Sequence, residues 1–297
     1  MSTARGKIEL EVDGFTIAAA TAGPAEPNGA PLLACLHGGL YRGRYFDVAG
    51  GPGGSFMDLA SANGFPVVAF DRPGYGDSSE VPTEENTFER QAELLAQAAS
   101  QAAEQVSAPG IVLVGHSIGG MIAVTLAGQG HDIPLWGVAC TGMGLVIPPG
   151  GPAEGLAAVA GSLPTDVFAP DPAMGDQVMF GPDWTYDPSV LPAAHESYAP
   201  APVVELKSAP LWSTEKLPDL APRVTVPIHN ELAEFDALWD SSPENVEGFA
   251  RLFTAAPFVD ASVSRGVGHS IDHHHLGRAL HLRQLAFADA CRLYATR

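Results

Sequence analysis

A serine in a glycine-rich turn is the residue with the clearest chemical potential in this sequence. The segment Gly115-His116-Ser117-Ile118-Gly119 fits the pattern G-x-S-x-G, with an apolar run before it and a helix-like segment after it. In a sharp turn between a strand and a helix, larger side chains would collide with neighbouring elements, which explains the flanking glycines. Such a turn exposes the hydroxyl at the carboxyl end of a sheet. Ser117 is therefore the predicted nucleophile; the alternative is an ordinary glycine-rich connection.

A serine hydroxyl is a poor nucleophile without a base, and His269 is the predicted base. His269 lies in the segment GVGHS, between the last predicted strand and the last predicted helix. Three more histidines follow at positions 273–275. We expect a solvated helix start there rather than a metal site, because metal ligands normally come from distinct elements or lie at i, i+4 spacing.

The base needs a carboxylate that holds its ring in the right tautomer. Glu234, Asp236 and Asp240 follow the strand that is predicted to end near Leu232. We predict Asp236 as the acid, with Glu234 and Asp240 as alternatives. Each of the three could instead be a charge that is favoured near a helix N-terminus. The chain order serine, acid, histidine differs from that of two other familiar serine triads.

Developing negative charge on a carbonyl oxygen needs two backbone N–H donors. Ile118, which follows the nucleophile at the start of its helix, is one predicted donor. The other should come from the loop after the first long apolar run, which reads His37-Gly38-Gly39-Leu40. Gly39 is the predicted second donor because glycine lets the backbone approach a substrate closely.

The elements that must position these residues alternate along the chain. Two alternating segments around Asp13-Gly14 predict an antiparallel hairpin. Short, continuous apolar runs that end in glycine-rich turns predict strands buried on both faces, at residues 31–39, 66–76, 110–120 and 134–142. Helix-like segments lie at 55–63, 87–105 and 118–128. This alternation predicts an α/β fold with a mainly parallel, doubly wound sheet.

The alternation stops between about residues 144 and 222 and then resumes with strands and helices up to the C-terminus. We predict a first core part at 1–143, a cap or lid insertion at 144–222 and a second core part at 223–297. Candidate substrate contacts come from the loop after Gly39, from the nucleophile turn and from the aromatic residues of the cap: Tyr41, Phe46, His116, Trp184 and Trp212.

The acidic composition narrows the range of partners. The formal net charge is −19, from 34 acidic and 15 basic side chains, and no basic cluster stands out. We therefore do not expect the protein to bind nucleic acid. The three cysteines are widely separated, which predicts buried free thiols in a reducing compartment. No apolar stretch approaches the length of a membrane span, so we expect a cytoplasmic protein. The composition does not predict an oligomeric state.

Several separated motifs together resemble the α/β-hydrolase superfamily over nearly the whole chain. They are LHGG at 36–39, DRPGYGDSS at 71–79, GHSIGG at 115–120, VPIHNELAEFD at 226–236 and GVGH at 266–269. The resemblance implies a three-layer fold with an eight-stranded sheet, a cap after strand six, and catalysis without cofactor or metal. Ala233 departs from the glycine common in such enzymes, which leaves the acid open among the three carboxylates.

The nucleophile narrows the chemistry that the resemblance implies. Haloalkane dehalogenases and epoxide hydrolases of this superfamily use aspartate where this chain has Ser117. We therefore expect a carboxylesterase-type hydrolase that cleaves an ester, lactone or related acyl bond of a small, largely apolar molecule through an acyl-enzyme. The alternatives are a lyase or cyclase that uses the same triad, and a ligand receptor on a hydrolase scaffold.

Overall fold

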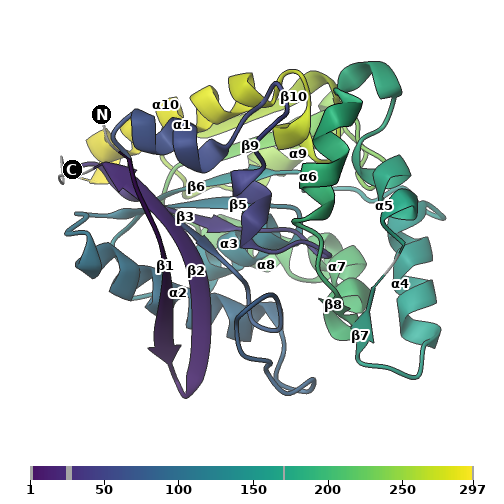
Figure 1. Ribbon diagram of the computed structural model, residues 1–297, viewed down its shortest axis with the longest axis horizontal. Coiled ribbons are helices and arrows are strands. Elements are labelled where there is room, and N and C mark those ends of the chain that lie inside the picture. The colour runs from purple at the N-terminus through teal and green to yellow at the C-terminus, as the bar shows by residue number, and fades with distance from the viewer. Residues whose placement is uncertain (1–2, 25–28, 170, 296–297) are drawn as a thin grey trace.

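The computed structural model describes residues 3–24, 29–169 and 171–295. Eight strands form one sheet in the order β1-β2-β4-β3-β5-β6-β9-β10. Figure 1 shows the sheet with helices packed around it. The strands are β1 (Thr3–Val12), β2 (Phe15–Pro24), β3 (Leu32–Leu36), β4 (Val67–Phe70), β5 (Ile111–His116), β6 (Leu135–Thr141), β9 (Ile228–Phe235) and β10 (Val259–Gly268). The predicted eight-stranded sheet is confirmed.

The sheet is parallel from β4 through β3, β5, β6 and β9 to β10. Strands β1 and β2 form the predicted antiparallel hairpin, and β2 also pairs antiparallel with β4. The hairpin turns at Asp13 and Gly14, which have φ angles of 50° and 83°. Positive φ at both turn residues matches the right-handed twist of the flanking strands.

Helices cover both faces of the sheet, and each face has its own apolar core. The core helices are α1 (Phe56–Ala62), α2 (Phe88–Gln105), α3 (Ile118–Gln129), α9 (Pro243–Leu252) and α10 (Gly277–Ala295). Helices α1 and α10 lie on one face, and α2 and α3 pack together on the other. Every residue of β3, β4 and β5 is buried, as the continuous apolar runs predict.

Residues 144–222, hereafter the inserted segment, connect β6 to β9. The segment holds a two-stranded ribbon and short helices: β7 (Val167–Phe168), β8 (Ala201–Pro202), α4 (Pro152–Ser162), α5 (Pro172–Met179), α6 (Leu191–His195), α7 (Val203–Glu215) and α8 (Leu217–Leu220). Figure 1 shows α4, α5 and α7, coloured teal to green, gathered at one end of the sheet. A proline stands in the first turn of α4, α5, α6 and α8, where its missing N–H costs no intrahelical hydrogen bond, and Pro210 lies inside α7.

The three cysteines, Cys35, Cys140 and Cys291, are free and buried, as the sequence predicts. Within the described ranges, none of the helices combines the length and apolar character that crossing a membrane requires.

Glycines allow helix α3 to approach the sheet at backbone distance. A Cβ atom at Gly119 would lie 2.0 Å from the carbonyl oxygen of Leu36, at the end of β3. A Cβ atom at Gly115 would lie 2.6 Å from the Cα of Gly120. Both contacts involve backbone atoms, which cannot move aside as a side chain can. The glycines of the G-x-S-x-G pattern therefore set the distance between β3, β5 and α3.

We predict that Gly119→Ala lowers the free energy of unfolding by about 3 kcal/mol or more, because overpacking against backbone exceeds the gain in helix propensity. The matched control is Gly155→Ala on the exposed face of α4, where an added Cβ meets nothing within 4 Å. The control should be neutral or stabilising by up to about 1 kcal/mol. Urea unfolding followed by circular dichroism measures both, and an equal effect of the two substitutions would contradict the prediction.

Candidate active site

Ser117 occupies a strained turn between β5 and α3. Its backbone angles are φ 53° and ψ −120°, outside the regions that residues with a side chain normally adopt. The Ser117 N–H donates to the Thr141 carbonyl oxygen at 2.8 Å, which ties the turn to the end of β6. The serine is 8% exposed. The turn therefore presents the hydroxyl at the carboxyl edge of the sheet at the cost of local strain.

His269 and Asp236 form a buried pair at the same edge of the sheet. Asp236 directly follows β9, and His269 directly follows β10. Nδ1 of His269 lies 2.9 Å from Oδ2 and 3.0 Å from Oδ1 of Asp236. The exposed fractions of the two side chains are 1% and 0%. Because a carboxylate can only accept, Nδ1 carries the proton and Nε2 is left free to act as a base.

Backbone donors hold the Asp236 carboxylate in place. Its Oδ1 also accepts from the N–H groups of Leu238 at 2.9 Å and Trp239 at 3.1 Å. The two alternative acids have other partners. Glu234 accepts from the Gly266 N–H at 2.8 Å, and Asp240 accepts from the Ser242 N–H at 2.9 Å. The structure thus brings Asp236, and neither alternative, to the histidine.

Nε2 of His269 is buried and has no hydrogen-bond partner among the described residues, Ser117 included. The ring nevertheless packs beside the nucleophile turn: its centroid is 4.9 Å from that of His116. A Cβ atom at Gly142 would touch both rings, at 2.9 Å from His269 and 3.0 Å from His116. Glycine at position 142 therefore keeps the space between β6 and the histidine open. Catalytic hydrogen bonds are often long in unliganded sites and shorten when a substrate binds.

Gly39 and Ile118 flank Ser117 and line a cavity of about 60 Å³ with it. Ile118 is the first residue of α3, so its N–H has no partner within the helix. Leu40, next to Gly39, has a φ of 65°, a second strained residue in the site. The two predicted N–H donors, Gly39 and Ile118, thus border the same cavity as the predicted nucleophile.

The wall of this cavity is apolar. Its side chains come from α3, from the loop after Asp236 and above all from the inserted segment, and they include Met121, Ile147, Leu156, Met179, Leu206 and Trp239. No described residue that lines the cavity carries a charge. A second cavity, of about 140 Å³, shares Leu40 and Met179 with the first and is also lined by Tyr41 and Tyr198.

The five predicted substrate contacts lie in different surroundings. Tyr41 lines the second cavity and exchanges a 2.8 Å hydrogen bond with Ser270. His116 is fully buried next to His269.

His116 and the other three predicted contacts do not line either cavity. Phe46 packs in the core against Phe56, and Trp212 is buried with its indole N–H donating to Thr125 at 3.1 Å. Trp184 is 63% exposed and packs on the outer side, against Phe235. An aromatic side chain in the sequence therefore does not by itself show whether the residue packs in the core or lines a pocket.

The expectation of a solvated helix start at the three histidines is wrong for His273 and His274, which are buried at 3% and 0% exposure. A short 3-10 helix, Ile271–His273, turns them inward before α10 begins. Nε2 of His274 lies 2.8 Å from the Phe180 carbonyl oxygen, and Nε2 of His273 lies 3.1 Å from that of Tyr45. Of the three, only His275 is exposed.

A buried carboxylate, Asp272, anchors this histidine cluster behind the triad. It accepts from the hydroxyl of Tyr45 at 2.8 Å and lies 3.1 Å from Nε2 of His281. The Tyr45 ring stacks on His116 at a centroid distance of 4.5 Å. Burial alone would raise the pKa of Asp272, but the hydrogen bond to His281 and nearby histidines hold that pKa well below its usual range. No group of residues suited to a metal ion is found in the described ranges.

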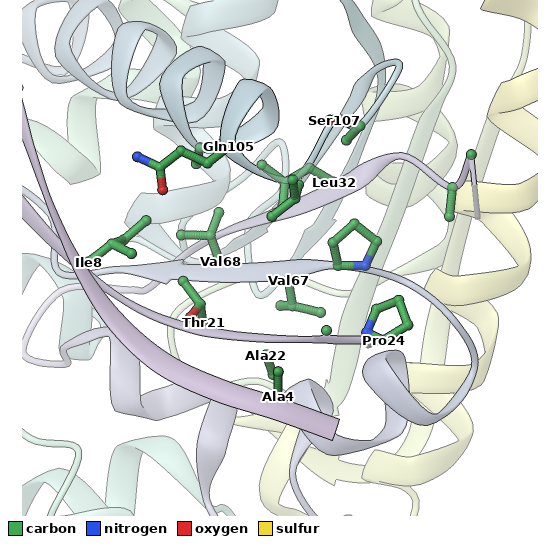
Figure 2. Close-up of a pocket in the computed structure, with 17 residues that line it drawn as sticks. Ala4, Ile8, Thr21, Ala22, Pro24, Leu32, Val67, Val68, Gln105 and Ser107 are labelled. Carbon is green, nitrogen blue, oxygen red and sulfur yellow. The ribbon is translucent and has the colours of Figure 1, made fainter. Parts of the chain in front are cut away.

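A wider hollow of about 350 Å³ lies far from the nucleophile in the sheet, and Figure 2 shows it. Its lining includes Leu32 and Val67, which begin strands β3 and β4, and Gln105 at the end of α2. It therefore opens at the amino ends of the parallel strands. Ligands of open α/β sheets bind at the opposite, carboxyl ends, where Ser117 lies.

Sequence reasoning missed two residues beneath the site, Arg72 and Glu205. Both are fully buried and paired, and Arg72 also contacts the loop that carries Gly39. The sequence does contain a signal for Arg72, which is a charged residue in the motif at residues 71–79, directly after a predicted buried strand. Nothing in the irregular sequence around Glu205 indicated its partner.

Comparisons with known proteins agree with this architecture. A family model described as the Alpha/beta hydrolase family matches residues 33–290. The fold is similar to that of a thermophilic esterase from Thermogutta terrifontis (21% identity, 96% of this chain and 98% of that chain covered, TM-score 0.67). It is also similar to that of an N-acyl homoserine lactonase (18%, 96% and 97%, 0.67) and an epoxide hydrolase from Vigna radiata (15%, 96% and 98%, 0.66). No curated protein matches the sequence.

We predict that the protein loses stability as the pH falls from 7 to 5. Burial lowers the pKa of His273 from 6.5 to about 4, although Asp272 opposes the shift, while His274 and His281 add to it. The unfolded chain therefore binds the proton first, and stability is present above pH 6.5 and declines as the pH falls toward 4. This one group should account for about 2 kcal/mol between pH 7 and 5.

The test compares urea midpoints at the two pH values for wild type, His273→Gln and the exposed neighbour His275→Gln. The first variant should lose distinctly less stability than wild type on acidification, and the second should match wild type. An unchanged pH dependence in His273→Gln would contradict the assignment.

Proposed function

The chain belongs to the alpha/beta hydrolase family, and on that basis we propose that it is a serine hydrolase that cleaves an ester, lactone or related acyl bond of a small, largely apolar molecule. The observation that carries the proposal is the strained Ser117 beside a His269–Asp236 pair, at the edge of a cavity without charged lining. The esterase and the lactonase among the structures of similar fold are consistent with it.

In the proposed first half-reaction, Nε2 of His269 takes the proton of the Ser117 hydroxyl as the oxygen attacks the substrate carbonyl carbon. The N–H groups of Gly39 and Ile118 donate to the resulting oxyanion. His269 then gives its proton to the leaving alkoxide, and the bond to the alcohol breaks. An acyl-enzyme on Ser117 is left, and Asp236 keeps the imidazole ring oriented and stabilises its charged form.

Water completes the reaction. His269 takes a proton from a water molecule that attacks the acyl carbon, and the same two N–H groups bind the second oxyanion. The bond to Ser117 then breaks as its oxygen takes the proton back from His269, and the carboxylic acid leaves. One water is consumed for each acyl bond, and no redox partner is required.

The size and lining of the cavity limit the substrate. The cavity at Ser117 is small, about 60 Å³, so we expect it to accept a short acyl chain more readily than a long one. The uncharged wall favours an apolar acyl group. Under this proposal, residues 144–222 act as the cap and supply half of the residues that line the cavity.

We predict that a fluorophosphonate probe labels Ser117 in the wild type, as read by intact and peptide mass. Labelling should disappear in Ser117→Ala and fall to the background rate in His269→Ala, because the hydroxyl needs its base. A matched control is Ser270→Ala, a buried serine next to His269 that should keep the label. Positive labelling is followed by a panel of p-nitrophenyl esters of increasing chain length, in which short acyl chains should react best. Absence of labelling in folded wild-type protein would overturn the serine mechanism and favour a lyase, cyclase or receptor.

We further predict that Asp236→Asn slows labelling of Ser117 by about two to four orders of magnitude, because an amide side chain no longer enforces the required histidine tautomer. Asp240→Asn should stay within about threefold of wild type, since Asp240 caps a neighbouring turn instead. Second-order labelling rates at fixed pH measure both variants. A larger effect at Asp240 than at Asp236 would show that the acid is wrongly assigned.

A further inference from the structure

A fully buried ion pair joins the core to the inserted segment directly beneath the proposed oxyanion hole. Arg72 lies just after β4, and Glu205 lies in α7; neither side chain has exposed surface. The contact is bidentate: Nη1 donates to Oε1 and Nη2 donates to Oε2 of Glu205, each at 3.0 Å. The two residues are 133 positions apart in the sequence.

The remaining donors of Arg72 reach the loop that carries Gly39. Its Nε donates to the His37 carbonyl oxygen at 2.8 Å, and Nη2 donates to that of Gly38 at 3.3 Å. The backbone N–H of Arg72 donates to Nε2 of His37 at 3.0 Å. Nε2 is therefore the acceptor, so the His37 proton is on Nδ1, which donates to the Gly38 oxygen at 2.8 Å. Arg72 Nη2 and His37 Nδ1 thus both donate to the Gly38 carbonyl oxygen and hold it in place.

The Gly38 carbonyl and the Gly39 N–H belong to the same peptide group. No cis peptide bond occurs among the described residues, so the two groups point in opposite directions from one rigid plane. Donors that hold the Gly38 oxygen on the Arg72 side therefore direct the Gly39 N–H to the other side of the loop. Gly39 borders the cavity there, together with Ser117.

Other buried groups complete the network around the carboxylate. The Tyr75 hydroxyl donates to Glu205 Oε2 at 3.0 Å, and Gln91 Nε2 donates to Oε1 at 2.5 Å. The Gln91 oxygen accepts from Arg72 Nη1 at 2.7 Å. A buried ion pair contributes little net stability relative to well-packed apolar side chains, but it fixes geometry when every donor and acceptor is satisfied. Stability alone therefore does not explain the pair.

The inserted segment contacts the same loop at two more places. Leu206, next to Glu205, lines the cavity, and its Cδ2 would lie 3.4 Å from a Cβ atom at Gly39. The Ala199 N–H donates to the Leu40 carbonyl oxygen at 2.9 Å. The inserted segment thus contacts the loop on both sides of the Gly39 peptide, and its position and the orientation of that peptide depend on each other.

We propose that Arg72 and Glu205 form a positioning clamp: together they orient the Gly39 N–H toward the oxyanion and tie that orientation to the docking of helix α7. The inference rests on the proposed serine chemistry and adds two positioning residues that touch no reacting atom. Because the clamp acts on the oxyanion donor, its loss should slow bond formation at Ser117 rather than weaken the binding of an apolar ligand.

The test separates these two effects in the fluorophosphonate reaction, whose phosphoryl oxygen takes the place of the oxyanion. The variant is Arg72→Met/Glu205→Met, which removes both charges and leaves no unpaired ion in the core. The maximal labelling rate, kinact, should fall by about 10- to 100-fold, while the reversible binding constant, KI, should stay within about threefold of wild type. Glu205→Gln, which keeps a hydrogen-bonding side chain, should lower kinact by a smaller factor.

The matched control is Glu231→Met/Arg283→Met, another bidentate pair with a buried glutamate, at distances of 2.6 Å. Its kinact should match wild type if clamp loss acts through the Gly39 peptide, and thermal unfolding checks that each variant is folded. Unchanged kinact in both clamp variants, or a loss confined to KI, would overturn the clamp alone. A folded wild type that is never labelled would overturn the proposed function and the clamp with it.

Discussion

The close approach of helix α3 to the carboxyl end of strand β3 is the constraint on which the site depends. At Gly119 the two backbones leave no room even for a methyl group, because the Leu36 carbonyl oxygen is already there. This contact places the first N–H groups of α3 next to the loop that follows β3. In the same turn Ser117 adopts an unfavourable backbone conformation, with φ 53° and ψ −120°. Packing energy from a large buried core sustains that strain.

Around this contact the site is assembled from strand ends. Residues at the carboxyl ends of β5, β9 and β10 supply Ser117, Asp236 and His269, so a parallel sheet alone brings them to one edge. The inserted segment supplies the apolar wall, and through Glu205 it also reaches the backbone that faces the nucleophile. Under the proposed mechanism, the substrate-binding wall and the oxyanion donors are therefore parts of one packed unit rather than separate modules.

How much of this could be predicted from the sequence depends on whether a residue's environment is set locally. The sheet, its helices and the edge position of Ser117 and His269 follow from apolar runs and glycine-rich turns, which are local patterns. The burial of His273 and His274 does not follow from such patterns, because a single 3-10 turn points their side chains inward. The surroundings of Trp184 and Trp212 depend on how a proline-rich segment packs, which periodicity does not encode. The Arg72–Glu205 pair is non-local in the same way, since each half lies in a separate part of the chain.

The uncharged lining of the cavity has a consequence for the end of the proposed reaction. Hydrolysis converts a neutral acyl compound into an acid that ionises at neutral pH, inside a wall that offers a carboxylate no counter-ion. The whole chain adds a formal charge of −19 around it. Beyond the proposed oxyanion donors and His269, the apolar wall that favours a neutral substrate therefore disfavours the ionised product. Under the proposed mechanism, we expect the free acid to bind more weakly than the neutral substrate and to compete weakly for the site as it accumulates.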